Sequence, residues 1–318
     1  MSTAEYIARR ALQLAPLLLL LTVIVFLMIH LAPGDPAQNL AGPRATDADI
    51  ERIRDAMGLN EPIIKQYGIW IGKMLTGDFG ESFISHRPVS DMIVERLWPT
   101  ALLMGTANIV SLLIAIPLGL IAAVKQYSLS DTVLTTITFV GISIPSFWFG
   151  LLLMWLFGIQ LQWLPLSGMA TPGEPATAIS VLQHLIMPAG VIAFIYTAFW
   201  MRFVRSGVLE VLTQDYVLFA RSKGLPAKRL YVKHVLRTGL MPLVTLIGLS
   251  VPELITGSVV IETVFSWPGL GLLTYSAANS RDFTVVMALV VLASIAVVIG
   301  NLLADLAYRW VDPRIRLT

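Results

Sequence analysis

The 318-residue sequence contains no cysteine and only four histidines, which are scattered along the chain. Without cysteine there is no disulfide framework, no thiolate ligand for a metal and no thiol nucleophile. The histidines show no spacing typical of metal ligands. We therefore expect neither a metal site nor a cofactor.

Charged side chains are also scarce. Asp, Glu, Lys and Arg make up 13% of the residues and 56% are hydrophobic, whereas a soluble domain carries about 25% charged residues. This composition predicts an integral membrane protein embedded in a lipid bilayer. The net charge is only +2, so nothing indicates a nucleic-acid partner.

Long apolar segments fill the chain, and a helix needs about 20 apolar residues to cross the hydrocarbon core. Six segments meet this requirement: Ala11–Leu31, Leu97–Val124, Thr132–Ile159, Val181–Met201, Thr238–Ile261 and Thr284–Ala304. The first is longer than a typical signal-peptide core and no small-residue cleavage site follows it, so we expect it to be retained. The sequence therefore predicts an all-α membrane protein with six transmembrane helices.

The spans divide the chain into four parts. Residues 1–32 form the N-terminus and first span, residues 33–96 two amphipathic helices outside the bilayer, residues 97–307 a five-span core, and residues 308–318 a tail. The two amphipathic helices either lie on the membrane or the bundle, or dock an outer partner.

Basic residues indicate the orientation. The loop of residues 202–237 holds eight Lys or Arg against two acidic residues, and the N-terminus and the tail add further arginines. Because cytoplasmic loops carry an excess of Lys and Arg, both termini and this loop are predicted to be cytoplasmic.

The basic loop has helical periodicity and a glycine break. Four apolar residues recur at helical spacing: Val208, Leu212, Tyr216 and Phe219. Gly224 suits the left-handed position after a helix, and Pro226 suits the first turn of the next one. These features predict an elbow, which consists of a helix, a glycine turn and a short helix that leads directly into the fifth span. Such an elbow could transmit a movement of a soluble partner into that span. The alternative is a basic anchor that meets lipid headgroups.

Two residues outside the loop are candidates for a translocation path. Glu253 is the one acid well inside a predicted span, where a charge costs about 2.5–3.5 kcal/mol. It either lines the path, where it would meet an amine or another cation, or lies near the outer interface. Trp267 belongs to an outer turn, which is either a gate over the path or an interfacial anchor.

Other classes of membrane protein lack support. A secondary transporter should show inverted repeats and intramembrane ionisable pairs, and neither is visible. A membrane-embedded enzyme would need paired acids or a histidine cluster inside the spans, and none is present. The chain also has no G-x-x-x-x-G-K-[ST] motif for binding ATP.

Several blocks follow one another in order along the chain: HLAPGDP at His30–Pro36, GLNEPIIKQY at Gly58–Tyr67, GDFGESF at Gly77–Phe83, SIPSFWFGLLL, QDYVLFARSKGLPAKRLYVKHVLRTGLMPLVT, IETVFSWPGLG at Ile261–Gly271, RDF at Arg281–Phe283 and the closing DPRIR. In this order they resemble the permease subunits of ABC importers of the dipeptide/oligopeptide type. The resemblance implies the fold of a type I importer permease in the bacterial cytoplasmic (inner) membrane.

The resemblance also implies that the elbow is a coupling helix seated on an ATP-binding subunit. ATP hydrolysis would then occur in that partner, and this chain would not be an enzyme. The expected coupling residues are Asp215, Tyr216, Ala220, Arg221, Gly224 and Lys228, and the expected path residues are Glu253 and Trp267. The broader importer pattern has Glu-Ala-Ala where this chain has Leu218, Phe219 and Ala220. We therefore expect Arg221 or Asp215 to make the charged contact.

The implied partners are a homologous second permease subunit, ATP-binding subunits on the cytoplasmic face and an extracytoplasmic substrate-binding protein. Peptides are the expected substrate. Glutathione, nickel chelates and oligosaccharides are alternatives within the same family, and a secondary transporter is the alternative from a different class.

Overall fold

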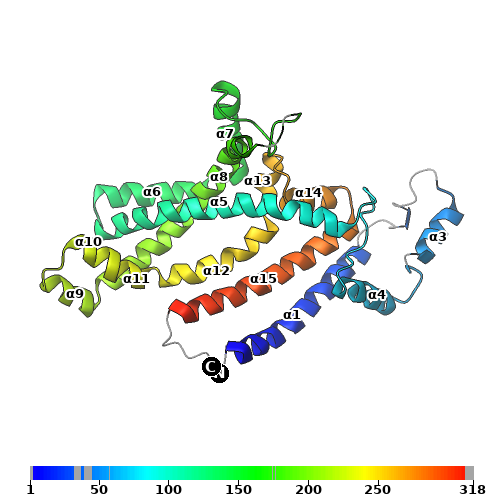
Figure 1. The fold of residues 1–318 in the computed structure, drawn as a ribbon, viewed down its shortest axis with the longest axis horizontal. Helices are drawn as coiled ribbons and strands as arrows, with labels where there is room; N and C mark the ends of the chain where they lie inside the picture. The colour runs from blue at the N-terminus through cyan, green and yellow to red at the C-terminus, as the bar shows by residue number, and fades with distance from the viewer. Residues whose placement is uncertain are drawn as a thin grey trace.

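The computed structural model describes residues 3–31, 37–38, 45–56, 58–173, 175 and 177–311, and these residues form helices joined by turns (Figure 1). Two blocks used in the sequence comparison, at residues 32–36 and 312–316, lie outside the described residues. The helices are α1 (Thr3–Leu31), α3 (Asp47–Ala56), α4 (Ile63–Leu75), α5 (Val89–Val124), α6 (Leu129–Ser143), α7 (Ser146–Leu153), the π-helix η1 (Met154–Gln160), α8 (Ala178–Leu212), α9 (Asp215–Ser222), α10 (Ala227–Arg229), the π-helix η2 (Leu230–Val235), α11 (Leu236–Gly239), α12 (Met241–Thr256), α13 (Val259–Val264), α14 (Leu270–Asn279) and α15 (Phe283–Val311).

Among the described residues, four helical segments are long and apolar enough to cross a membrane: Val89–Val124, Ala178–Leu212, Met241–Val264 and Phe283–Asp305. A fifth candidate is the pair formed by α6 with α7 and η1, which is bent by 100°. Its break lies at Pro145, where the sequence predicts one. In α1 the apolar part is Pro16–Met28, so the total of six spans stays a prediction.

The predicted fifth span is not one continuous helix. α12 ends at Thr256, and Gly257 has a φ of +72°. Because only glycine adopts this conformation at little cost, the helix is interrupted here before α13 begins. The C-terminal residues of the predicted span, 259–261, therefore belong to the separate short helix α13.

The long helices lie side by side in Figure 1. α5 packs along α8, while α12 packs along α15 and α1 lies against α15. The short helices α9 and α10 form one end of the bundle, α3 and α4 lie at the opposite end, and α7 projects from one side.

The helix α4 packs against α1 through polar and aromatic contacts. The hydroxyls of Tyr67 and Thr22 are 2.8 Å apart, and the Nε2 atom of His30 is 3.0 Å from the side-chain oxygen of Gln66. The ring of the buried Phe26 contacts the rings of Tyr67 and Trp70. For α4, this arrangement supports the interpretation in which the amphipathic helix lies on the bundle.

Glycines allow helices to approach each other closely at the core. A Cβ atom on Gly207 of α8 would lie 2.2 Å from the carbonyl oxygen of Gly239 at the end of α11. A Cβ atom on Gly119 of α5 would lie 2.7 Å from the side chain of Val204. Small residues of this kind let helix backbones touch inside a membrane. α8 is therefore held tightly on both sides near its C-terminal end.

Replacement of Gly207 tests this backbone contact. Gly207→Ala should lower the free energy of unfolding by about 1–3 kcal/mol, since the added methyl group overpacks a site that has no room for it. Gly190→Ala on the same helix is the control, because no neighbouring element lies within 4 Å of the place its Cβ atom would occupy. Melting temperatures in detergent should fall for the first variant only. Equal melting of the two variants would contradict the contact.

Candidate functional site

The elbow in the structure has the form that the glycine and proline predict. α9 ends at Ser222, and the N–H of Gly224 donates to the carbonyl of Arg221 at 3.0 Å. Gly224 has a φ of +74° with open space around it, so this position requires glycine for its backbone conformation. Pro226 then precedes α10, η2 and α11, which lead directly into α12.

The side chains of α9 differ in orientation from the prediction. The sequence pattern places Tyr216 and Phe219 on the same apolar stripe as Val208. In the structure Val208 is buried, whereas Tyr216 and Phe219 are exposed and Val217 is buried in their place. The reason is that α8 ends at Leu212 and α9 begins afresh at Asp215. The helical phase therefore does not continue across the turn.

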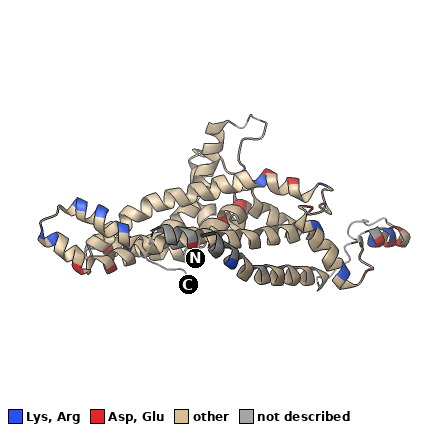
Figure 2. Cartoon of the chain, turned by 60° about the horizontal axis from the view of Figure 1, so that its bottom comes forward, with Lys and Arg blue, Asp and Glu red and all other residues tan. Residues whose placement is uncertain are grey.

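The tip of the elbow combines exposed apolar residues with basic residues. Tyr216, Leu218 and Phe219 are 45%, 51% and 61% exposed, and Figure 2 shows Lys and Arg gathered at the end formed by α9 and α10. The other residues predicted for coupling lie on this tip as well. Asp215, Arg221, Gly224 and Lys228 are exposed, and Ala220 is half-buried. A hollow of about 500 Å³ beside them is lined by Pro226, Lys228, Arg229, Val232 and Lys233.

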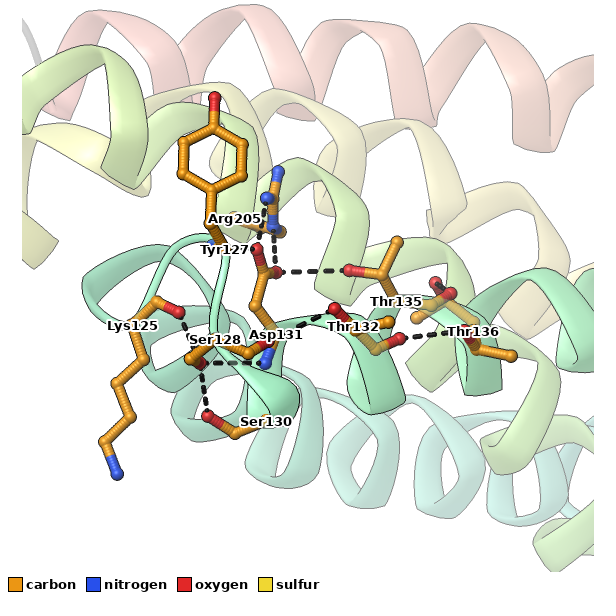
Figure 3. Close-up of polar contacts among 10 residues, drawn as sticks. Lys125, Tyr127, Ser128, Ser130, Asp131, Thr132, Thr135, Thr136 and Arg205 are labelled. Carbon is orange, nitrogen blue, oxygen red and sulfur yellow. Dashed lines mark hydrogen bonds and ion pairs between the residues drawn. The ribbon is translucent and has the colours of Figure 1, made fainter.

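An ion pair between the buried Asp131 and the half-buried Arg205 joins α6 to α8 near the same end (Figure 3). The Nε and Nη2 atoms of Arg205 donate to the two carboxylate oxygens of Asp131, each at 2.8 Å. Asp131 is only 5% exposed. Its carboxylate also accepts hydrogen bonds from the N–H of Tyr127 at 3.0 Å and the hydroxyl of Thr135 at 3.2 Å. This fork geometry is among the strongest ion-pair arrangements in proteins.

The same carboxylate organises the turn between α5 and α6. Tyr127 has a φ of +62°, and its N–H is held by Asp131. Ser128 caps α6 by accepting from the N–H of Asp131 at 3.3 Å. Asp131 was not among the residues predicted from the sequence. A Ser-x-x-Asp capping pattern was present as a signal, but it does not identify the partner on α8.

The acid predicted for the path, Glu253, is exposed on α12. Its carboxylate accepts a hydrogen bond from the hydroxyl of Tyr196 on α8. The two side chains place a polar group between two long apolar helices. Sequence reasoning did not identify Tyr196, because 57 residues separate it from Glu253.

A second acid, Glu262 on α13, is fully buried. Its carboxylate accepts from the N–H of Leu272 at 3.0 Å and from the hydroxyl of Thr100 at 3.2 Å. Leu272 lies in the first turn of α14, which has no side-chain cap of its own. Since an N-terminal turn favours a negative group, Glu262 serves as the cap of α14. The sequence analysis did not single out this residue.

Three glycines enclose this carboxylate. A Cβ atom on Gly257, Gly269 or Gly271 would lie 2.1, 2.4 or 2.9 Å from an oxygen of Glu262. Trp267 is buried beside them, and its Nε1–H donates to the carbonyl of Pro99 on α5 at 2.9 Å. In this conformation Trp267 packs in the core, and its role in a path stays a prediction.

At the end of the molecule opposite the elbow, another buried carboxylate fixes the segment before α5. The hydroxyl of Ser82 donates to the carboxylate of Asp282 at 2.5 Å, and both residues are buried. The N–H of Phe83 donates to the other oxygen of this carboxylate at 3.3 Å. The GDFGESF and RDF blocks of the sequence therefore meet in space. Within the described part of the chain, no group of three or more His, Asp or Glu residues could hold a metal ion.

Comparisons with known proteins give the family. The N-terminal part of the binding-protein-dependent transport system membrane component matches residues 3–104, and the binding-protein-dependent transport system inner membrane component matches residues 115–317. The chain belongs to this family. The permease is 43% identical to the oligopeptide transport system permease protein AppB of Bacillus subtilis, over 98% of this chain and 99% of that protein. It is 39% identical to the glutathione transport system permease protein GsiC of Salmonella typhi, over 98% and 99% of the two chains.

A solved structure supports the fold. A chain of the MetNI methionine ABC transporter, in an inward-facing conformation, superposes with a TM-score of 0.53 at 17% identity. The match covers 69% of the permease and 96% of that chain. The permease therefore has the helical fold of an ABC importer permease of type I, as the sequence predicts.

The two acids of α12 and α13 should respond differently to neutralisation. Glu262→Gln places an amide NH₂ group among hydrogen-bond donors and removes the cap of α14. It should lower the free energy of unfolding by about 1–3 kcal/mol. Glu253→Gln, at an exposed position, should stay within about 0.5 kcal/mol of the unmodified permease. Thermal unfolding in detergent measures both, and a stable Glu262→Gln variant would show that the buried contacts are not needed.

Proposed function

We propose that this permease forms half of the transmembrane path of an ATP-driven importer for dipeptides and oligopeptides. The observation that carries the proposal is the elbow, whose exposed apolar tip is joined without a flexible linker to α8 and α12. The whole-chain similarity to an oligopeptide permease supports peptides as the substrate. Glutathione is the second candidate, because GsiC is similar over the same length. Nickel chelates and oligosaccharides are further alternatives.

The tip of the elbow docks on an ATP-binding subunit. Exposed aromatic side chains surrounded by charges are typical of protein interfaces, and Tyr216 and Phe219 fit this description. Ala220 and Gly224 allow close approach and the turn, while Asp215, Arg221 and Lys228 make polar contacts around the aromatic residues. ATP hydrolysis takes place in the docked subunit, so the permease itself is not an enzyme.

The charge distribution supports an orientation in the cytoplasmic membrane. The basic elbow faces the cytoplasm together with both termini. The α3–α4 end then lies outside, where a substrate-binding protein delivers its cargo. In α3 the hydroxyl and the N–H of Thr46 donate to Asp49 and lower the pKa of its carboxyl group, so this helix start remains charged in the medium outside.

A homologous second permease completes the path. α7 projects from the bundle (Figure 1). A largely apolar hollow of about 560 Å³ lies at its junction with α6. The hollow is lined by Phe139, Val140, Ser143, Ile144, Pro145, Phe147 and Trp148. A helix of the second subunit fills it and so covers side chains that the bundle leaves exposed.

Within the path, Glu253 attracts the amino group of a peptide. Its exposure and its contact with Tyr196 supply a carboxylate of fixed position between α8 and α12. Trp267 has an indirect role in the path, since its hydrogen bond to Pro99 fixes the turn before α14.

A secondary transporter, the alternative from another class, would need no ATP-binding partner.

Docking is tested by Phe219→Asp. The variant should fold normally, because the ring is exposed, but it should reduce co-purification of the ATP-binding subunit at least tenfold, since a charge would replace an apolar contact at the interface. Leu75→Asp is a matched control, an exposed apolar residue at the opposite end. Pull-down from membranes that contain the complete transporter measures both. Undiminished co-purification with Phe219→Asp would contradict docking at the tip.

Substrate recognition is tested with Glu253→Gln in the reconstituted transporter. ATPase stimulation by the loaded binding protein should be measured with dipeptides, longer peptides, N-acetylated peptides and glutathione. We expect free peptides to stimulate the wild type, and Glu253→Gln to reduce their transport at least fivefold but that of N-acetylated peptides much less. No stimulation by any peptide would exclude a peptide substrate, and equal transport by both proteins would exclude the role of Glu253.

A further inference from the structure

The ion pair between Asp131 and Arg205 fixes the geometry between α6 and α8 more closely than apolar packing would. The carboxylate has four hydrogen bonds, two of them to the guanidinium group. Replacing a buried ion pair by apolar residues of similar size is often neutral or stabilising, so stability alone does not account for a charged pair here. What the pair adds is a fixed orientation of α6 relative to α8, since a bidentate contact holds only at one distance and one angle.

The pair lies where α8 meets the end of α11 and α5. Arg205 is two residues from Gly207, whose backbone touches Gly239 at the end of the elbow. Val204, the preceding residue, packs against Gly119 of α5. One turn of α8 therefore contacts the elbow, α5 and, through the ion pair, the first turn of α6.

We propose that Asp131 and Arg205 are positioning residues for energy coupling, whose ion pair makes the α5–α6 turn move as one body with α8 and the elbow. This inference rests on the proposed function, in which the elbow is driven by ATP-binding subunits. Apolar contacts between helices allow small sliding movements, whereas the fork between Arg205 and Asp131 opposes them. Without the pair, part of the elbow's movement is lost between α8 and α6.

The absence of cysteine makes this movement measurable. Cysteines introduced at Gln126, in the α5–α6 turn, and at Ser222, at the end of α9, are the only thiols in the permease, and both positions are exposed. Spin labels there report the distance between the turn and the elbow by pulsed electron paramagnetic resonance. The complete transporter is measured in lipid nanodiscs without nucleotide and after trapping with ATP and vanadate, so no transported substrate is needed.

The test compares the wild-type permease with two variants of the ion pair and one control variant. Asp131→Asn with Arg205→Gln removes both charges and avoids an unpaired buried charge, and Arg205→Lys keeps the charge without the fork. The control is Arg87→Gln with Glu95→Gln, which removes an exposed ion pair outside the elbow end. Trialanine transported per ATP hydrolysed is measured in liposomes on the same proteins, or with the peptide that best stimulates the ATPase.

In the wild type and the control, the label distance should be the same with and without trapped nucleotide. In the Asp131→Asn, Arg205→Gln permease it should shift or broaden on trapping, and transport per ATP should fall at least fivefold. Arg205→Lys should give an intermediate loss, which also provides the test if the double variant does not assemble. Wild-type distances and transport per ATP in the variants would overturn the inference. Failure of the wild type to bind an ATP-binding subunit would instead overturn the proposed function, and the inference with it.

Discussion

The close packing of α8 is the constraint on which the rest of the structure depends. Near its C-terminal end the helix touches α5 through Gly119 and the elbow through Gly239, at distances that leave no room for a side chain. Such contacts replace the hydrophobic effect, which does not draw helices together inside a lipid bilayer. As a result the elbow is not an appendage of the bundle. It continues a tightly held helix of the bundle, so a force applied to the tip of the elbow would reach the spans.

Three acids, Asp131, Glu253 and Glu262, have different environments, and each environment indicates a role. Asp131 is neutralised by Arg205, and Glu262 is enclosed by donors and glycines. Glu253 is exposed and has one hydroxyl partner. Since a buried charge needs compensation, the first two are explained by the fold itself. Of these three acids, Glu253 is the one whose position these contacts do not explain, and this is the basis of our proposal that it meets the transported molecule.

The structural features that depend on local sequence signals were predicted correctly. Gly224 and Pro226 specified the elbow, Pro145 the break after α6, and the apolar runs the long helices. The sequence did not predict the partners of Asp131 and Glu253, because 74 and 57 residues separate the members of each pair. The phase of α9 was also missed, since a turn of two residues resets the helical repeat. The burial of Glu262 depends on three glycines and on α5, none of which a local pattern places around it.

The π-helix η2, between the tip of the elbow and α12, has a geometric consequence of its own. A π-helix closes each hydrogen bond over one more residue than an α-helix does. η2 therefore holds an extra residue in the stretch of chain between Gly224 and α12. Each residue in an α-helix corresponds to a rotation of about 100°. Reversion of η2 to regular α-helix would therefore turn the exposed face of α9 about the axis of α12 without breaking a covalent bond. A change in the winding of η2 by one residue would in this way link rotation of the tip to displacement of α12.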